Sequence, residues 1–473
     1  MLAGLVSAQD PPRFESIHLV FAEEHSRSVV SGFGHLFVCL PSDPIHGVND
    51  LLDSPCLNFG ADTGPHGKGM WVGNYQIQYG HTLIRKNSRF DQRRLTIFEL
   101  GIAPEKLQAL YADLRERVNE DYPYDFIRHN CGQYLLDWLD GPEATPTALL
   151  YLTPREAVDK ILDLHPARRV QVIASDLDVL LDGIASAEDP DPKSVGKAIR
   201  SPELIRDIED EELRLLTIQV AESFADASEF EYLAALRASL LESAGGPEAA
   251  LAVIERRKAL ESRLVEVPLE SEEGPRMWFG PSHVPGQDQV GVTIAWEAGL
   301  RSPFTKPLEA DHLREVSFLA GELRHLGDST RADFTLAKLS NYRNAGGVLG
   351  GGSNGIEIGY QGLENEFGLT GLTATTWAGL SWRIGNAWIC PRVTLQADDL
   401  ISNPMLDLAP GLQLFWTGPT FNATFSSHYD WEQQLGLNAL LTWDQKDGRA
   451  FLARWVRSPD GMESFSLGYS IRL

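Results

Sequence analysis

The sequence predicts a multidomain chain: an α+β domain in residues 14–165, a helical segment in 166–280 and an antiparallel β-barrel in 281–473. Two observations predict this order. Charged amphipathic helices dominate the middle of the chain, and a strict period of two dominates its end. A length of 473 residues, 43% of them hydrophobic, suits two to four units with separate cores.

The first part mixes short strands with helices. The runs SIHLVFA (16–22) and GHLFVCL (34–40) are apolar or alternating, as in strands. Pro104 occupies the favoured first turn of a helix. A second helix begins near Cys131, shows one apolar face and ends at Gly141.

The middle part contains only amphipathic helical patterns separated by loops rich in Pro, Asp and Gly. Examples are SPELIRDIEDEELRLLTIQVAESF and EAALAVIERRKALESRLVEV. No chemical motif occurs there, so we expect a helical spacer.

The last part alternates apolar and small or polar residues up to the final residue, Leu473. Such alternation suits a soluble sandwich with its apolar face inward, or an outer-membrane barrel with that face outward. The number of segments, about ten to twelve, the recurrence of Trp and Tyr near segment ends, and the apolar final strand favour the barrel. Pro391, inside a strand, argues against it.

Composition excludes several function classes. The formal net charge is −25, with 66 acidic and 41 basic residues and no basic block, so nucleic acid is not an expected partner. No metal-ligand spacing, P-loop or dinucleotide fingerprint occurs, and we expect no metal and no cofactor. The N-terminus, MLAGLVSAQDPPRF, suits either the end of a secretory signal or a plain flexible terminus.

Cys131 and His35 are the candidate catalytic pair. A cysteine at a helix N-terminus is expected to have a lowered pKa, and free N–H groups there could receive an oxyanion. His35 lies on a predicted strand between Gly32 and Gly34, which allow close approach of another backbone. The alternatives are a buried structural cysteine and a core histidine. Lower-ranked candidate bases are His25, His46, His66, His81 and His129.

Four segments resemble the Lnb-type periplasmic domain of bacterial envelope proteins: SGFGHLFV, LNFG, YGHTLIRKNSRFDQRRLTIFEL and YDFIRHNCGQYLLDWLD. The resemblance spans about residues 14–165. It implies a circularly permuted, papain-related thiol fold with Cys131 as nucleophile and His35 as base. The family activity it implies is intramolecular acyl transfer on bacterial lipoproteins.

The same resemblance suggests roles for four further residues. Asn58 of LNFG would orient the imidazole, although an ordinary strand asparagine is an equal alternative. Tyr124 and Asp125 would support the helix start, and Asn130 would cap it. The substrate-binding residues are not predicted.

The other cysteines have expected structural roles. Cys39 shares a strand face with His35 and could line the pocket, or pair with Cys56 in an oxidising compartment. Cys390 is expected to be an isolated barrel residue.

Three functions remain open on the sequence alone. The first is a thiol acyltransferase acting on a lipid or lipoprotein, and the second a thiol hydrolase of the cell wall on the same fold. The third is a non-catalytic envelope protein. For all three we expect a periplasmic N-terminal domain and an outer-membrane barrel in the cell envelope.

Overall fold

The structure is a computed structural model of the whole chain, and its contacts divide the chain into two compact units. The first comprises residues 1–191 and 197–269, and the second residues 192–196 and 270–473. The structure describes residues 14–472 except 15, 24–33, 42–50, 63–68, 119, 125–128, 145–151, 188–190, 244, 267–275, 285–288, 302–311, 327–328, 346–351, 362–371, 399–404, 418–420, 430–434, 445–448 and 458–462. The possible signal segment at the N-terminus lies outside these residues.

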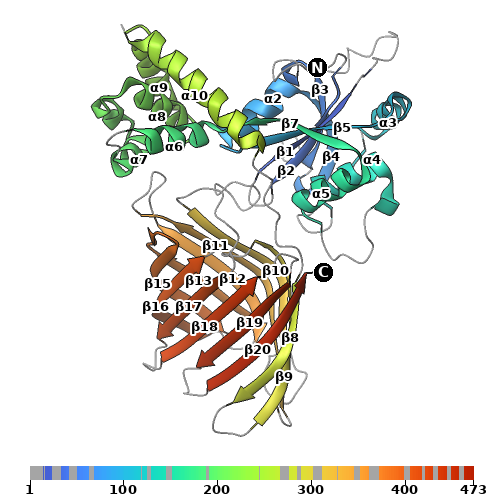
Figure 1. Cartoon of the computed structure of the whole chain (residues 1–473), viewed down its shortest axis with the longest axis vertical. Coiled ribbons are helices and arrows are strands. Elements are labelled where there is room, and N and C mark those ends of the chain that lie inside the picture. Colours follow the sequence, from blue (N-terminus) through green and yellow to red (C-terminus); the bar gives the residue numbers. More distant parts are fainter. Residues whose placement is uncertain are drawn as a thin grey trace. The chain divides into compact units, whose positions relative to one another are not determined.

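The first unit is built on a seven-stranded sheet with strand order β6-β4-β3-β2-β1-β5-β7 (Figure 1), and the strand pairings of its described residues are antiparallel. The strands are β1 (Ile17–Ala22), β2 (His35–Cys39), β3 (Pro55–Asp62), β4 (Gly69–Tyr79), β5 (Leu95–Leu100), β6 (Tyr122–Pro123) and β7 (Ala167–Ile173).

Each face of this sheet buries its own apolar cluster. One cluster joins alternate strand residues, among them Leu36 and Val38, to the helices α3 (Pro104–Arg117), α4 (Cys131–Asp140) and α5 (Pro154–Leu164). The other face packs Phe37 and Cys39 against α2 (Gly80–Arg85). Successive side chains of β2 therefore enter different environments.

The remaining helices are η2 (Lys86–Phe90), η3 (Pro142–Ala144), α6 (Asp176–Ser186), α7 (Pro192–Arg200), η4 (Pro202–Asp207), α8 (Glu211–Glu222), α9 (Ala227–Leu241) and α10 (Gly246–Glu266). Two of them, η2 and η3, lie between strands of the sheet in the chain, and the others follow its last strand, β7. Among the described helices, none is both long and apolar enough to cross a membrane.

Among the described residues, the expected helical middle part, 166–280, contains the strand β7 and the first residues of β8 (Arg276–Val284). Residues 167–173, ARRVQVI, pair with β5 as β7 and extend the sheet. Val170 and Val172 alternate with Gln171, and these β-branched residues suit an edge position beside β5 better than a helix. The predicted domain limits at residues 165 and 280 stay predictions.

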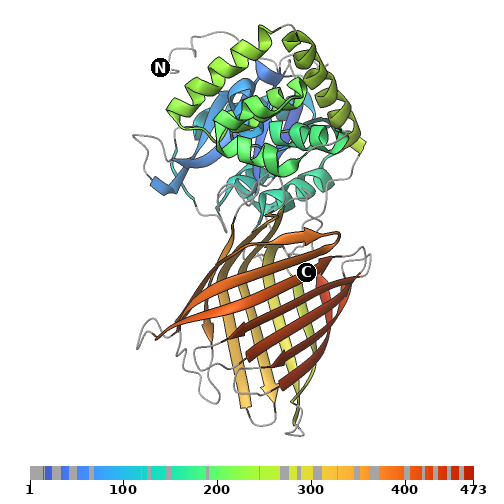
Figure 2. The same ribbon diagram turned by 90° about the vertical axis from the view of Figure 1, so that its left-hand side faces the viewer.

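The second unit is a closed antiparallel barrel. Its strands are β8 (Arg276–Val284), β9 (Gln289–Arg301), β10 (His312–Leu326), β11 (Ser329–Arg343), β12 (Ser353–Gln361), β13 (Leu372–Gly379), β14 (Trp382–Ile384), β15 (Ala387–Asp398), β16 (Met405–Thr417), β17 (Phe421–Tyr429), β18 (Leu435–Asp444), β19 (Arg449–Arg457) and β20 (Glu463–Arg472). β8 pairs with β20, and β13 pairs with β15, which closes the wall. Figure 2 shows these strands tilted across the wall.

The wall has 12 strands in the described residues, because the short β14 continues the line of β13 along β15. Pro391 lies opposite the break between β13 and β14. The Pro391 carbonyl accepts a hydrogen bond from the Leu380 N–H. Because the N–H and C=O of a strand residue point to the same side, the N–H that proline lacks would also point toward the break. The proline that argued against a barrel is thus placed where the ladder is interrupted.

The barrel is apolar outside and polar inside. On β9, Val292 and Ile294 are 52% and 41% exposed, whereas Thr293 between them is fully buried. The buried polar side chains of the barrel are Ser282, Thr293, Ser317, Ser340, Ser353, Ser381, Thr394, Gln413, Asn422, Thr442 and Ser466. A soluble sandwich would show the reverse pattern, so this barrel has the surface of a membrane protein.

We predict that Ile294→Arg on the outer face impairs membrane assembly. An arginine on the lipid side costs about 2–4 kcal/mol near the bilayer midplane. The measurement is heat-modifiable gel mobility of the full chain refolded into lipid vesicles, with Ile294→Leu as the matched control. If both variants fold equally well, the outer face does not contact lipid.

Candidate active site

Helix α4 begins at Cys131 because Asn130 caps it. Asn130 has an extended backbone, and its Oδ1 accepts hydrogen bonds from the N–H groups of Gly132 (2.9 Å) and Gln133 (3.2 Å). Its Nδ2 donates to the Leu152 carbonyl at 2.6 Å. The cap therefore fixes Cys131 in the first turn of the helix.

Two glycines allow close packing around the candidate pair. Gly34 has φ +73°, and an added Cβ would lie 3.1 Å from the carbonyl oxygen of Ala22. At Gly132 a Cβ would come within 2.9 Å of Pro154 and Ala157 on α5. Both positions need glycine, the first for its backbone angle and the second for its lack of a side chain.

His35 is oriented by Asn58. Its Nε2 lies 2.6 Å from Asn58 Oδ1, across the β2–β3 pair. Because a carbonyl oxygen only accepts, Nε2 carries the proton and Nδ1 of the neutral ring is left as an acceptor. The structure thus joins two of the three predicted catalytic residues by a hydrogen bond and leaves the imidazole one acceptor nitrogen.

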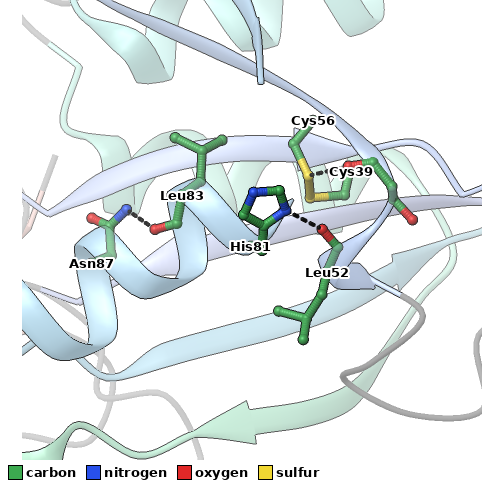
Figure 3. Close-up of a disulfide and its surroundings, with 7 residues drawn as sticks. Cys39, Leu52, Cys56, His81, Leu83 and Asn87 are labelled. Carbon is green, nitrogen blue, oxygen red and sulfur yellow. Dashed lines mark hydrogen bonds between the residues drawn. A yellow bond between two sulfur atoms is a disulfide. The ribbon is translucent and has the colours of Figure 1, made fainter. Parts of the chain in front are cut away.

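A disulfide connects the same two strands. Cys39 and Cys56 face each other in the β2–β3 register, and their sulfur atoms are bonded (Figure 3). This disulfide is the Cys39–Cys56 pairing that the sequence left as one of two alternatives for Cys39. It lies on the same sheet face as His35, because His35 and Cys39 are four residues apart on one strand.

The Cys131 sulfur lies beside the peptide that follows His35. The backbone N–H of Leu36 hydrogen-bonds the sulfur, and α4 packs against β2. The described residues of β2 and β3 pair only from Phe37 to Cys39. Leu36, whose N–H contacts the sulfur, lies just before the first paired residue.

The thiol and the imidazole approach β2 from different faces. Cys131 belongs to the cluster containing Leu36 and Val38. His35 alternates with Leu36, and its ring lies 6.3 Å from that of Phe37. Within the described residues no hydrogen bond joins the two side chains, so the structure brings them to one stretch of strand without coupling them directly.

Burial raises the pKa of the Cys131 thiol to about 11, which corrects the sequence-based expectation of a lowered pKa. The side chain is 3% exposed, and desolvation disfavours the thiolate. Backbone N–H groups of Leu36, Gly132 and Cys131 and the charge of Arg93 lower the pKa, but by less. The N–H groups at the helix N-terminus lower the pKa of the thiol as expected, but the loss of hydration raises this pKa by more.

Burial also lowers the pKa of His35, to about 3. The positive charge of Arg93 acts in the same direction, and the hydrogen bond to Asn58 opposes both. At neutral pH the site therefore contains a thiol and a neutral imidazole, rather than a thiolate–imidazolium ion pair.

The helix N-terminus offers fewer oxyanion donors than the sequence suggested. The N–H groups of Gly132 and Gln133 are both engaged by Asn130. The cap and an oxyanion would compete for these donors, because a helix leaves only its first N–H groups unpaired.

Other predicted residues lie around this centre or outside the described part. Tyr124 is buried, donates its backbone N–H to the Trp71 carbonyl and stacks on Phe59. His129 lies near Tyr134, and His81 is exposed and contacts the Leu52 carbonyl. Outside the described residues lie Asp125, Gly32, His25, His46 and His66.

Arg93 is a residue that the sequence argument missed. Ala22 pairs with both His35 and Leu95, so the segment just before Leu95 lies at the same end of the sheet as His35. Gln92, with φ 52°, precedes Arg93, whose side chain is 7% exposed. Its charge influences the pKa of both Cys131 and His35.

The Arg93 turn is held in place by hydrogen bonds. Gln92 Nε2 donates to the Arg89 carbonyl, and its Oε1 accepts from the Leu177 N–H at 2.8 Å. In the sequence, Arg93 belongs to the basic run RKNSRFDQRR, which is typical of a solvated surface. Nothing local marks one arginine of that run as buried.

Across the described residues, no three His, Cys, Asp or Glu side chains form a cluster that could hold a metal ion. The chemistry available at this site is therefore that of a thiol, an imidazole, an amide and a guanidinium.

The fold and the family comparison define a class: an envelope protein with a periplasmic N-terminal domain and a membrane-type barrel. Residues 9–163 match the family model of the Lnb N-terminal periplasmic domain. This match confirms the resemblance seen in the sequence, and the chain carries an Lnb domain in its first third. Together with the apolar outer face of the barrel, it indicates an outer-membrane location.

Solved structures give weaker likenesses. KdgM porin has 9% identity and a TM-score of 0.26, covering 42% of this chain and 99% of its own. The Acinetobacter baumannii outer membrane protein Omp33 has 9% identity and a TM-score of 0.25, with 43% and 100% coverage. The beta domain of the Bordetella autotransporter Brka has 12% identity and a TM-score of 0.22, with 42% and 99% coverage. The comparison with curated proteins finds no match.

We predict that loss of the disulfide loosens the strands that carry His35 and Asn58. A bridge closing a loop of about 15 residues contributes about 3 kcal/mol, and these cysteines are 17 residues apart. The measurement is hydrogen exchange of β2 and β3 in the full chain with and without reductant. A Cys39→Ser/Cys56→Ser variant is the control, since reductant should not change it further. Equal protection in all samples would contradict the prediction.

We predict that acid destabilises the first unit through His35. The unfolded imidazole has a pKa of 6.5 and the folded one about 3, so the unfolded chain binds the proton first. The stabilisation is complete above pH 6.5 and is lost as the pH falls toward 3. Scanning calorimetry of the full chain at pH 7 and 5 should show a smaller loss for His35→Gln than for the wild type. His81→Gln, at an exposed site, should behave as the wild type.

Proposed function

We propose that the N-terminal domain is a thiol acyltransferase, anchored by the barrel at the outer membrane. Cys131 is its nucleophile, His35 its base and Asn58 the residue that orients the base. One observation carries the proposal. The imidazole of His35 is hydrogen-bonded to Asn58, and the backbone N–H of the next residue, Leu36, contacts the Cys131 sulfur. Nucleophile, base and orienting amide therefore converge on one end of β2.

The reaction proceeds in two balanced steps. In the first step the His35 side chain turns toward the sulfur at the end of β2, and Cys131 Sγ attacks the carbonyl carbon of an ester. The thiol proton passes to His35 Nδ1 and then to the departing alcohol as the C–O bond breaks. An amine then attacks the thioester, the C–N bond forms and the C–S bond breaks. The amine proton returns through His35 to the sulfur, which regenerates the thiol.

The dry surroundings of the sulfur favour transfer to an amine over hydrolysis. Cys131 is 3% exposed and packs in a cluster with Phe59, Tyr75 and Tyr124. The aromatic ring of Phe59 stacks at 4.0 Å on Tyr134, one turn into the same helix. Excluding water protects a thioester from hydrolysis, and apolar rings suit an acyl chain better than a sugar or peptide.

The substrate we propose is the ester-linked acyl chain of a lipid or lipoprotein. The match to the Lnb periplasmic domain supports this substrate class, because the resemblance of these segments implies acyl transfer on lipoproteins. A barrel with an apolar outer face would keep the domain close to such substrates.

The neutral resting pair needs charge stabilisation during attack. Because Asn130 engages the N–H groups of Gly132 and Gln133, we assign Arg93 to this role. Its buried guanidinium favours an anion at the sulfur or at the substrate oxygen, since a charge acts strongly where water is excluded.

A non-catalytic envelope protein is the second candidate. The same burial that excludes water holds Cys131 protonated, with its pKa raised to about 11. In that case the thiol is a structural residue of the apolar cluster and no acyl adduct forms.

We predict that the full chain in lipid vesicles forms an acyl thioester on Cys131 when given a synthetic diacylated lipopeptide with a free amine. The measurement is the intact mass of the protein, with loss of the adduct in hydroxylamine, and the formation of amide-linked lipopeptide. His35→Ala should slow adduct formation by about 10²–10⁴-fold, because general-base catalysis contributes that much.

Cys390→Ser is the matched control, since the other described free thiol is buried in the barrel. It should acylate like the wild type, whereas Cys131→Ser should not. Equal labelling of the Cys131→Ser variant, or no adduct on the wild type, would favour the non-catalytic protein.

A further inference from the structure

We propose that the barrel is not an open pore, because two bridges of side chains cross its lumen and close it to ionic solutes. The first bridge is an ion pair, and the second is a packed group of aromatic rings with an arginine and a glutamine. The inference concerns the second unit and does not depend on the proposed acyltransferase.

The ion pair joins Arg454 on β19 to Glu322 on β10. In the wall these two strands are separated by β9, β8 and β20. Both side chains point inward, because their neighbours Leu323 and Ala453 alternate with them and Leu323 is exposed on the outside. A bond between strands so far apart in the wall runs across the lumen.

The second bridge joins β11 to β16, which are separated in the wall by β12, β13 and β15. The ring of Tyr342 lies 4.7 Å from that of Phe415, and its hydroxyl donates to Gln413 Oε1 at 3.4 Å. Both Tyr342 and Phe415 are at most 2% exposed. The contact therefore fills the space between parts of the wall that are four strands apart.

Neighbouring side chains widen this second bridge. Trp377 stacks on Tyr342 with ring centroids 5.0 Å apart, and the Arg392 guanidinium lies 5.3 Å over Trp377. Arg392 also donates to Gln413, and the fully packed Trp388 belongs to the same cluster. Such rings are larger than the Ser and Thr side chains that line the rest of the inner wall.

The aromatic bridge lies near the mouth at which the chain enters the barrel. Tyr342 is one residue from the end of β11, and antiparallel strands place that end at the mouth where β8 begins. Glu322 and Arg454 pair across the lumen, and Arg392 is held by Gln413 on the neighbouring strand. An ion entering there would have to displace these groups and desolvate among rings.

The test is the conductance of the full chain reconstituted in planar lipid bilayers in potassium chloride. We expect the wild type to show no stepwise openings. A combined variant, Glu322→Ala/Arg454→Ala/Tyr342→Ala/Phe415→Ala, should open steps of uniform size. Leu408→Ala, on the outer face, is the control and should stay closed.

Heat-modifiable gel mobility establishes that each variant is folded before it is measured. Release of a small sugar from loaded vesicles provides a second readout for the wild type, which requires no variant. Stepwise conductance or sugar release with the wild type would overturn the proposal. A folded combined variant that stays closed would also overturn the assignment of closure to these bridges.

Discussion

The register between β2 and β3 is the constraint on which the candidate site depends. Cys39 opposite Cys56 fixes this register covalently, and His35 reaches Asn58 two residues further along the same face. Because a slip of one residue turns every side chain of a strand to the other face, any other register would separate the imidazole from its amide. The pairing also ends at Leu36, where the Cys131 sulfur meets the strand.

Desolvation dominates the electrostatics of the site. The helix N-terminus, the Leu36 N–H and Arg93 all favour a thiolate, yet burial keeps the proton on sulfur. Burial likewise keeps His35 neutral. A site of this kind gains its reactive charge separation only with a substrate in place, and this limits wasteful reaction with water.

Local signals in the sequence predict local structure, and long-range pairing accounts for what they miss. Asn130 before Cys131 predicts the helix start, because a cap acts within three residues. Arg93 is invisible to such reasoning, since its position depends on Ala22 pairing with two other strands. The depth of Cys131 depends on α5 packing at Gly132. The alternation of apolar and polar residues around Ile294 likewise predicts a strand, but it does not show which face of the strand points outward. The closure of the wall determines that face.

The two units bury opposite kinds of side chain, and this has a consequence for substrate access. The first unit buries apolar clusters on both faces of its sheet, whereas the barrel buries Ser and Thr and exposes Val, Ile and Leu. A closed barrel with an apolar outer face can hold a protein in lipid without an open lumen, because its backbone hydrogen bonds are all made between strands. If the rings of Tyr342 and Phe415 close its lumen, no acyl donor passes through the barrel. In the proposed reaction, the ester substrate would then reach Cys131 from the membrane surface or the periplasm, where lipids and lipoproteins reside.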